Sequence, residues 1–336
     1  MNASGWSVSP TGDREFGRFE FVQESPVVAV SSLCILVFAS AMGTFGNLLI
    51  LTAVFRVIPT KSLEFIFVGN LALSDSIVTL VIDPLNILGK LEGEWLFRAV
   101  PVLCKGMGYL CTVSCVNSLG SIVLMSSSRY VSICHHSLYK KIFNKGTCIA
   151  MCSGLYLTGL LLVLLNLAGI GDHSFNRKSL ECIWDRTHTY SYTLSFTIFL
   201  VWIPLLMAGS FYVSIFLKFR ASSRKIANAT SSSHHRKPMY LARTLFLIYA
   251  AFALCWIPYA ILMAADRKDT FPYEIHVMIT TFAHLHPSFN WLVLYYTNTL
   301  FRKAFNSMVK LDKCFCSKKD MRVNNCSTIS NNTTGM

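Results

Sequence analysis

Two charged residues lie inside long apolar segments of this chain, where a charge needs a physical reason. Asp75 is in the middle of residues Leu63–Leu88, and Arg129 is close to the end of Pro101–Ile133. Charges within membrane spans are expensive and commonly mark switches, ion sites or proton relays. Asp75 is therefore expected to be an ion site or a switch, or else a structural carboxyl that is hydrogen-bonded or protonated. Arg129 places a charge at the inner end of the third segment, and its plain alternative is a side chain that simply extends to the membrane interface.

Most of the twelve cysteines lie within apolar segments and are expected to be small packing residues. Cys104 instead stands at the outer start of the third apolar segment, and Cys182 lies in the outer loop that follows. Both would face an oxidising compartment, and a bridge between them would hold the loop over the helices. Cys314 and Cys316 lie just after the last apolar segment, where we expect palmitoylation, with ordinary free thiols as the alternative.

The composition indicates that membrane-spanning helices position these residues. The chain is 53% hydrophobic and 14% charged, whereas soluble domains average about 25% charged residues. A helical span needs roughly 20 apolar residues and a barrel strand about 10, and the apolar segments here are of helical length. We predict an all-α membrane protein, a seven-transmembrane helix bundle. Its helices are expected at Val27–Val54, Leu63–Leu88, Pro101–Ile133, Thr147–Ala168, Tyr190–Phe219, Tyr240–Ala264 and Tyr273–Thr297.

The charge pattern predicts the orientation of these helices. With the N-terminus outside, 20 of the 30 Lys and Arg residues lie in inner segments and 13 of the 17 acids lie outside, as the positive-inside rule requires. The net charge of +13 suits anionic membrane lipids and an acidic cytosolic partner. Because that charge flanks membrane spans, we do not expect the chain to bind nucleic acid. We expect a multi-pass protein of the plasma membrane.

Four regions follow from this topology. They are an extracellular tail over 1–26, a seven-transmembrane domain over 27–298, a short amphipathic helix on the inner leaflet over 299–312, and a cytoplasmic tail over 313–336. The first region is polar and shows no apolar core of a signal peptide. Asn2 begins an Asn-Ala-Ser acceptor sequence, so we expect an N-linked glycan there on the outer side.

Seven short motifs occur in order along the expected helices. They are Gly46-Asn47, Leu73-Ser74-Asp75, Trp95-Leu-Phe97, the pair Cys104 and Cys182, Ser128-Arg129-Tyr130, Pro204 followed by Tyr212, and Cys255-Trp256-Ile-Pro258. Together they resemble the rhodopsin-like G-protein-coupled receptors. The segment from Arg129 to Tyr139 is most similar to the melatonin-receptor-like group, and it also resembles the insect receptors Moody and Trapped in endoderm.

The resemblance implies a receptor that binds an extracellular ligand and catalyses nucleotide exchange on a heterotrimeric G protein. Trp256 and Pro258 would form a hinge under the ligand, while Arg129, Tyr130 and Tyr212 would meet the G protein. A phosphorylated tail would bind arrestin, and the chain is not expected to be an enzyme. The alternative function is a membrane transporter, or another multi-span protein without G-protein coupling. A transporter would predict inverted repeats, and we find none.

The chain departs from the family pattern around Asp75. In the family this carboxylate takes part in a sodium site, and the matching residues here are Ser118 and Asn290. His286 stands at the position of a further partner in that site. A sodium ion near Asp75 is the one cofactor that the resemblance suggests, and whether it binds stays open.

A second departure concerns the restraint on Arg129. Relatives hold this arginine with a neighbouring acid, which is Ser128 here, and sometimes with an acid entering the sixth helix, where residues 234–238 contain none. We therefore expect Arg129 to lack an acidic partner and ligand-free signalling to be raised. Leu294 opposes this expectation, because it replaces a seventh-helix tyrosine that stabilises the active state of relatives.

The residues at two positions restrict the chemical class of the expected ligand. Monoamine receptors have an aspartate where this chain has Cys111, and visual pigments have a retinal-binding lysine where it has His284. A cationic monoamine and covalent retinal are therefore disfavoured. We expect a largely neutral pocket for a small neutral amphiphile, a lipid, an indole-like molecule or a peptide, and no metal site. The expected pocket residues are Cys111, Thr112, Cys115, Trp256, Tyr259, Met263, Thr280 and His284.

Overall fold

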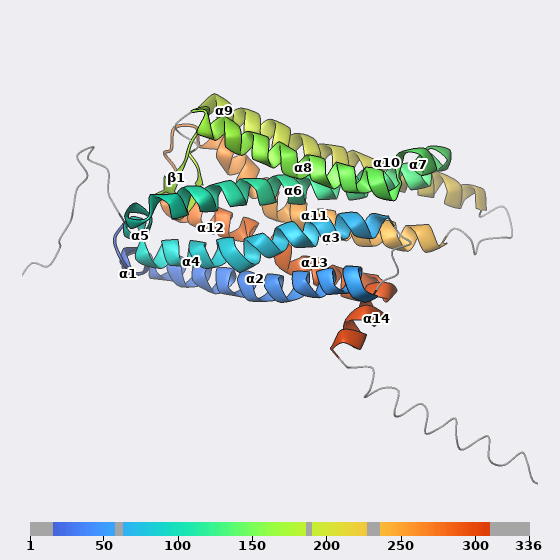
Figure 1. Ribbon diagram of the computed structural model, residues 1–336, viewed down its shortest axis with the longest axis horizontal. Helices are drawn as coiled ribbons and strands as arrows, with labels where there is room; N and C mark the ends of the chain where they lie inside the picture. The colour runs from blue at the N-terminus through green and yellow to red at the C-terminus, as the bar shows by residue number, and fades with distance from the viewer. Residues whose placement is uncertain (1–15, 58–62, 186–189, 227–235, 310–336) are drawn as a thin grey trace, which may run out of the picture.

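The computed structural model describes residues 16–57, 63–185, 190–226 and 236–309, which form a bundle of seven spans with a small hairpin at one end (Figure 1). Six helices in this part of the chain are long and apolar enough to cross a membrane. In chain order the spans are α2 (Pro26–Thr52, continued by the π-helical Ala53–Val57), α3 and α4 (Glu64–Ile77 and Asp83–Glu92, joined by the π-helical Val78–Ile82), α6 (Pro101–Cys134), α8 (Lys145–Leu167), α9 and α10 (Tyr190–Phe196 and Ile203–Ile226, joined by the π-helical Thr197–Trp202), α11 (Arg236–Ala265), and α12 and α13 (Tyr273–Ala283 and His286–Thr297).

Three of these spans are irregular next to a proline. The π-helical segments of the second and fifth spans end two residues before Pro84 and Pro204, and the break between α12 and α13 comes just before Pro287. A proline has no N–H for the carbonyl four residues earlier, so the preceding turn rearranges. The continuous helices predicted for these three spans are therefore interrupted. Pro258, by contrast, lies inside α11, which remains helical.

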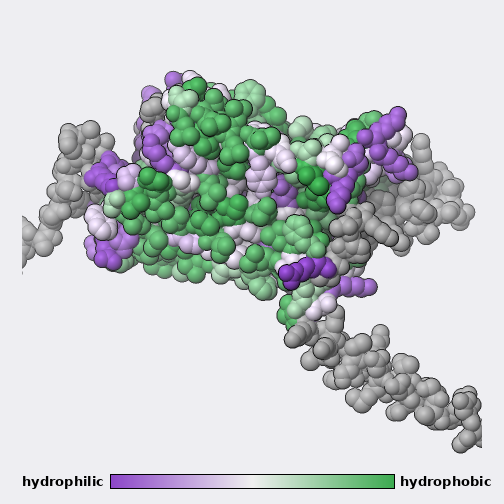
Figure 2. All heavy atoms as spheres, viewed as in Figure 1, coloured by the Kyte–Doolittle hydropathy of each residue, from purple (hydrophilic) through white to green (hydrophobic). Residues whose placement is uncertain are grey.

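The outer surface of the bundle is apolar along its middle and polar at its two ends, as Figure 2 shows for one face. Leu157, Leu161 and Leu164 of α8 are more than half exposed, as are Leu206 and Val213 of α10. A contiguous apolar surface of this extent marks contact with lipid rather than water. The lipid-facing belt separates the two polar ends, where the candidate sites lie.

A two-stranded antiparallel hairpin covers one end of the bundle, an element that the all-α prediction did not contain. Its strands are β1 (His173–Asn176) and β2 (Glu181–Trp184). The disulfide between Cys104 and Cys182 joins β2 to the start of α6. The short helix α1 (Glu20–Glu24) lies beside the hairpin, because Phe16 and Phe21 pack with Leu180 and Val277 in one buried apolar cluster.

At the other end, helix α14 (Thr299–Met308) follows the last span after the cap residue Asn298. Phe301 and Phe305 are buried, with Phe301 packed edge-on against Phe65 and Phe305 stacked on Tyr295. The apolar face of this helix thus packs on the bundle instead of lying only on lipid. The remaining short helices are α5 (Glu94–Ala99) and α7 (His136–Ile142). The predicted sites at Asn2, Cys314 and Cys316 lie outside the described residues.

Candidate functional site

The hairpin is held against α6 by His173 as well as by the disulfide. His173 Nε2 lies 2.9 Å from the Thr112 hydroxyl oxygen, and its ring packs edge-on against Tyr109. The α6 backbone comes close here at Gly108, where any side chain would collide with the imidazole. Burial lowers the pKa of His173 to about 4, and Lys105 lowers it further while Asp172 opposes the shift. The predicted pocket residue Thr112 therefore contacts the hairpin.

The low pKa of His173 predicts that acid loosens the hairpin. Its pKa is lower in the folded receptor than the usual value of about 6.5, so the stabilisation is complete above that value and is lost as the pH falls toward 4. By pH 5 the loss is about 2 kcal/mol. We expect the melting temperature of the purified receptor to fall between pH 7.5 and pH 5 by more in the wild type than in His173→Gln. His136→Gln, at an exposed inner histidine, is the control that should behave as the wild type.

Aromatic side chains fill the centre of the predicted pocket. The Trp184 ring of β2 lies 4.6 Å from Phe196 and 5.8 Å from Tyr259, and the Tyr259 ring lies 5.6 Å from Trp256. A void of only about 10 Å³ remains beside them. The predicted residues Tyr259, Met263 and Thr280 do meet around this void, together with Trp184 and His276.

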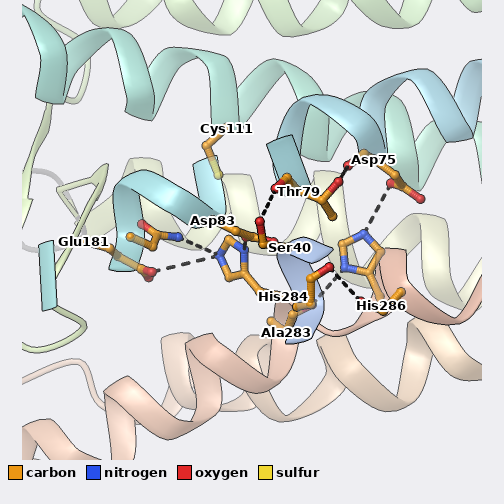
Figure 3. Close-up of polar contacts among 12 residues, drawn as sticks. Ser40, Asp75, Thr79, Asp83, Cys111, Glu181, Ala283, His284 and His286 are labelled. Atoms are coloured by element: carbon orange, nitrogen blue, oxygen red, sulfur yellow. Dashed lines mark hydrogen bonds and ion pairs between the residues drawn. The ribbon is translucent and has the colours of Figure 1, made fainter. Parts of the chain in front are cut away.

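The predicted pocket residue His284 lies in a buried charged cluster nearer the second span. His284 Nδ1 lies 2.6 Å from Asp83 Oδ1, and its Nε2 lies 3.4 Å from Asn86 Nδ2 and 4.0 Å from Glu181 Oε2 (Figure 3). Lys90 Nζ lies 3.9 Å from Glu181 Oε2. The expectation of a largely neutral pocket is therefore wrong, because the hairpin and α4 bring three charged side chains into it.

Cys111 and Cys115 lie on the same side of α6, with their sulfur atoms 3.9 Å apart. Figure 3 draws Cys111 in the same view as the charged cluster, and its contact with a ligand stays a prediction. The sequence reasoning missed Asp83 and Lys90, although both are charges near or within the second apolar segment and meet the criterion that singled out Asp75. Glu181 gave no such signal, since an acid in an outer loop is ordinary.

Each carboxylate oxygen of Asp75 accepts a hydrogen bond from another side chain. Ser118 Oγ donates to Asp75 Oδ1 at 2.7 Å, and Asn290 Nδ2 donates to Oδ2 at 2.6 Å. His286 Nε2 lies 3.6 Å from Asp75 Oδ1 (Figure 3). The structure thus brings the three predicted switch residues together and adds an imidazole to them.

The His286 ring is oriented by the break in the seventh span. Its Nδ1 lies 2.8 Å from the carbonyl oxygen of Ala283, the group that loses its helical N–H partner at Pro287. Trp256 Nε1 also lies 3.3 Å from the same Nδ1 atom. One nitrogen cannot donate to Ala283 and accept from Trp256 together, and the shorter bond satisfies a carbonyl that would otherwise be unpaired.

Arg129 at the inner end of α6 has an acidic partner after all. Its guanidinium forms an ion pair with Glu64 at the start of α3, and the Tyr139 hydroxyl donates to Glu64 Oε1 at 3.1 Å. Both charged residues are buried, with 5% of Arg129 and 6% of Glu64 exposed. The expectation that Arg129 lacks an acid is wrong, because the acid comes from another helix and not from Ser128.

The two tyrosines predicted to meet the G protein lie on the fifth-span side of Arg129. Tyr130 stacks on Phe211 with ring centroids 5.1 Å apart, and the Tyr212 ring packs against Phe246 and Tyr249. The Tyr212 hydroxyl is buried and has no hydrogen-bond partner in the described part of the chain.

The seventh span differs from the family pattern as the sequence indicated. Leu294 is buried and points into the bundle, whereas Tyr295 is turned toward Phe305. Trp291 packs edge-on against Phe45, in space left by the missing side chain of Gly46.

Comparisons with known proteins agree with this architecture. Residues 46–299 match the family model described as "7 transmembrane receptor (rhodopsin family)". Among curated proteins, the zebrafish (Danio rerio) melatonin receptor type 1B-B is 23% identical over 83% of this chain and 82% of its own length. The human melatonin receptor type 1B is 22% identical over 91% of this chain and 86% of its own.

Among solved structures, squid rhodopsin has the same fold, with a TM-score of 0.75 and 20% identity over 93% of this chain and 91% of that one. The family match covers most of the chain and includes every span described above except the start of the first. Relatives of this kind are receptors and not enzymes, and none of them supports a transporter. The chain therefore belongs to the rhodopsin family of seven-transmembrane receptors and is a G-protein-coupled receptor related to the melatonin receptors.

Proposed function

We propose that this receptor lies in the plasma membrane with its N-terminus outside, binds a small extracellular ligand beneath the hairpin, and activates a heterotrimeric G protein through Arg129. The observation that carries the proposal is the arrangement along α6. Its outer end faces the buried cluster of Asp83, Glu181 and His284, and its inner end presents Arg129 in a buried ion pair. A ligand that binds one helix arrangement better than the other shifts the population, and with it the accessibility of Arg129.

Trp256, Pro258 and His286 connect the two ends in this proposal. Trp256 contacts the Tyr259 ring on the ligand side and the His286 ring on the Asp75 side, with centroids 5.6 Å and 5.8 Å away. A rotation of Trp256, two residues before Pro258, would therefore move contacts on both sides. Tyr130 and Tyr212 would then meet the G protein, anionic lipids would contact the basic inner face, and arrestin would bind the tail. We further propose a glycan on Asn2 and acyl chains on Cys314 and Cys316.

The proposal is tested in cells that carry biosensors for each G-protein class and the full chain with an N-terminal epitope tag. A compound library that includes melatonin, the molecule for which the relatives are named, is applied at equal surface levels. Staining of the tag on intact cells measures those levels and tests the orientation. We expect a response that is lost in Arg129→Ala. A response retained by that variant, or solute uptake without any biosensor signal, would contradict the proposal.

We also propose that His286 takes the place of a sodium ion beside Asp75. The imidazole lies against the carboxylate that Ser118 and Asn290 already bond, and its orientation is fixed by Ala283. Replacing sodium chloride by N-methylglucamine chloride is expected to leave agonist potency unchanged within about twofold, or about 0.4 kcal/mol.

His286→Ala opens space next to Asp75 and should make potency depend on sodium. Asn290→Ala is not a suitable control, because it removes a bond to Asp75 itself. His136→Ala, at an exposed histidine on the inner side, is the matched control and should behave as the wild type. A tenfold or larger sodium effect in the wild type, about 1.4 kcal/mol, would show that the ion still binds.

A further inference from the structure

The charged cluster at the outer end of the bundle contains acceptor oxygens that the protein does not satisfy. Asp83, Asn86 and Glu181 are all buried. Asp83 Oδ2, Asn86 Oδ1 and both carboxylate oxygens of Glu181 have no hydrogen-bond partner among the described residues. Figure 3 shows Asp83 and Glu181 pointing toward His284 from opposite sides. A buried carboxylate without donors is costly, so these oxygens need donors that the chain itself does not supply.

The basic groups of the cluster do not supply these donors. His284 Nδ1 donates to Asp83 Oδ1, and its Nε2 lies 4.0 Å from Glu181 Oε2, beyond hydrogen-bond distance. The Lys90 ammonium donates to the carbonyl of Ser179 at 3.1 Å and lies 3.9 Å from Glu181 Oε2. The Glu181 carboxylate and Asp83 Oδ2 therefore lack N–H donors among the described residues.

An open basin above the hairpin carries a surplus of acidic side chains. Its volume is about 680 Å³, and its lining includes four acids and two basic residues. The acids are Glu94, Asp185, Asp269 and Glu274, and the bases are Arg177 and Lys178. A surface depression with a surplus of acids raises the local concentration of cations. The hairpin that lines this basin also carries Glu181 of the cluster.

From these observations we propose that the ligand of this receptor is a cation with several N–H donors, such as a primary ammonium or a guanidinium, whose charged group binds Asp83 and Glu181. The inference rests on the receptor function proposed above and specifies the ligand class of that site. The apolar part of the ligand would extend past Cys111 and Cys115 toward the aromatic rings of Trp184 and Tyr259. A cation was disfavoured from the sequence because Cys111 replaces an acid in α6. The structure supplies acids from α4 and the hairpin instead.

The test uses pairs of probes in which acetylation removes the positive charge. Tryptamine and phenethylamine are each compared with the N-acetylated form, which is neutral. Thermal stabilisation of the purified full-length receptor reports binding without a G protein, and the biosensor reports coupling. The variants are Asp83→Asn and Glu181→Gln. The control is Glu92→Gln, which removes a partly buried acid that pairs with Arg18 at the C-terminal end of the same helix α4.

We expect at least one amine to stabilise the wild type at concentrations where its acetylated form does not. Asp83→Asn and Glu181→Gln should each weaken that effect by on the order of tenfold to a hundredfold, as expected for lost hydrogen bonds to a charged group. Glu92→Gln should change it by less than about twofold. Stabilisation that is equal for the charged and acetylated probes, or unchanged in both cluster variants, would overturn the proposal.

A second measurement needs no ligand and guards against a variant that fails to fold. Because both carboxylate oxygens of Glu181 are buried without a hydrogen bond, Glu181→Gln removes an unsatisfied buried charge and should not lower the melting temperature of the ligand-free receptor. A lower melting temperature together with an intact amine response would show that Glu181 is a structural ion pair with Lys90. Binding of an amine without any biosensor response would support the ligand class and count against the coupling proposed above.

Discussion

Glu64→Gln is expected to raise G-protein activation in the absence of ligand several-fold. Arg129 is buried and its acidic partner in the structure is Glu64, so the substitution leaves a neutral amide beside the guanidinium. Partner binding requires Arg129 to leave this pair, which makes the pair a restraint on the active arrangement. Coupling free energies of this kind are about 1–3 kcal/mol, which corresponds to a shift of about 5- to 150-fold in the resting population.

The measurement is ligand-free biosensor activity at matched surface levels. Tyr139→Phe removes only the hydrogen bond to Glu64 and should give a smaller increase than Glu64→Gln. Ser128→Ala should have little effect, because the Ser128 hydroxyl has no hydrogen-bond partner among the described residues. Activity of Glu64→Gln equal to that of the wild type would show that Arg129 is restrained elsewhere.

Loss of the outer disulfide is expected to abolish surface expression. The bond between Cys104 and Cys182 closes a loop with a sequence separation of 78 residues. Removing a crosslink over such a loop costs about 4.5 kcal/mol in the chain-entropy account, which is comparable with the whole stability of many domains. The bond also holds β2 over the bundle, so its loss frees Glu181 and Trp184 from their buried places.

Cys104→Ser, Cys182→Ser and the double variant should be equally defective, since either change removes the same bond. Cys34→Ser is the matched control, because Cys34 is an exposed free thiol on α2. Intact-cell staining of an N-terminal tag gives the surface level. Normal levels and normal thermal stability in either single variant would mean that the bridge does not stabilise the mature receptor.

The spans were predictable from the sequence because their signal is local. A run of about 20 apolar residues identifies a membrane helix wherever it occurs, and the structure has helices in all seven places. The hairpin was not predictable in the same way. Its strands are only four residues long, and they are held by a disulfide and by contacts with α6 that no local pattern reveals.

The partners of buried charges were harder to predict than the charges themselves. Asp75 was found because it lies in the middle of an apolar segment, and its bonds to Ser118 and Asn290 follow the family pattern. Glu64 and Asp83 lie in the same span, yet their partners Arg129 and His284 depend on how the helices are rotated. The π-helical segment Val78–Ile82 separates the two parts of that span and changes which side of it faces the bundle.

The packing of Trp291 beside Gly46 restricts which substitutions this chain can accept at these two positions. Any side chain at Gly46 would overlap the indole ring of Trp291. A larger residue at position 46 therefore requires a smaller one at position 291, and the two cannot vary separately. Replacing Trp291 by a small residue would leave a void against α2 until Gly46 is replaced by a larger residue that fills it. The order of substitutions along such a path is therefore constrained, with contraction in the seventh span having to come before expansion in the first.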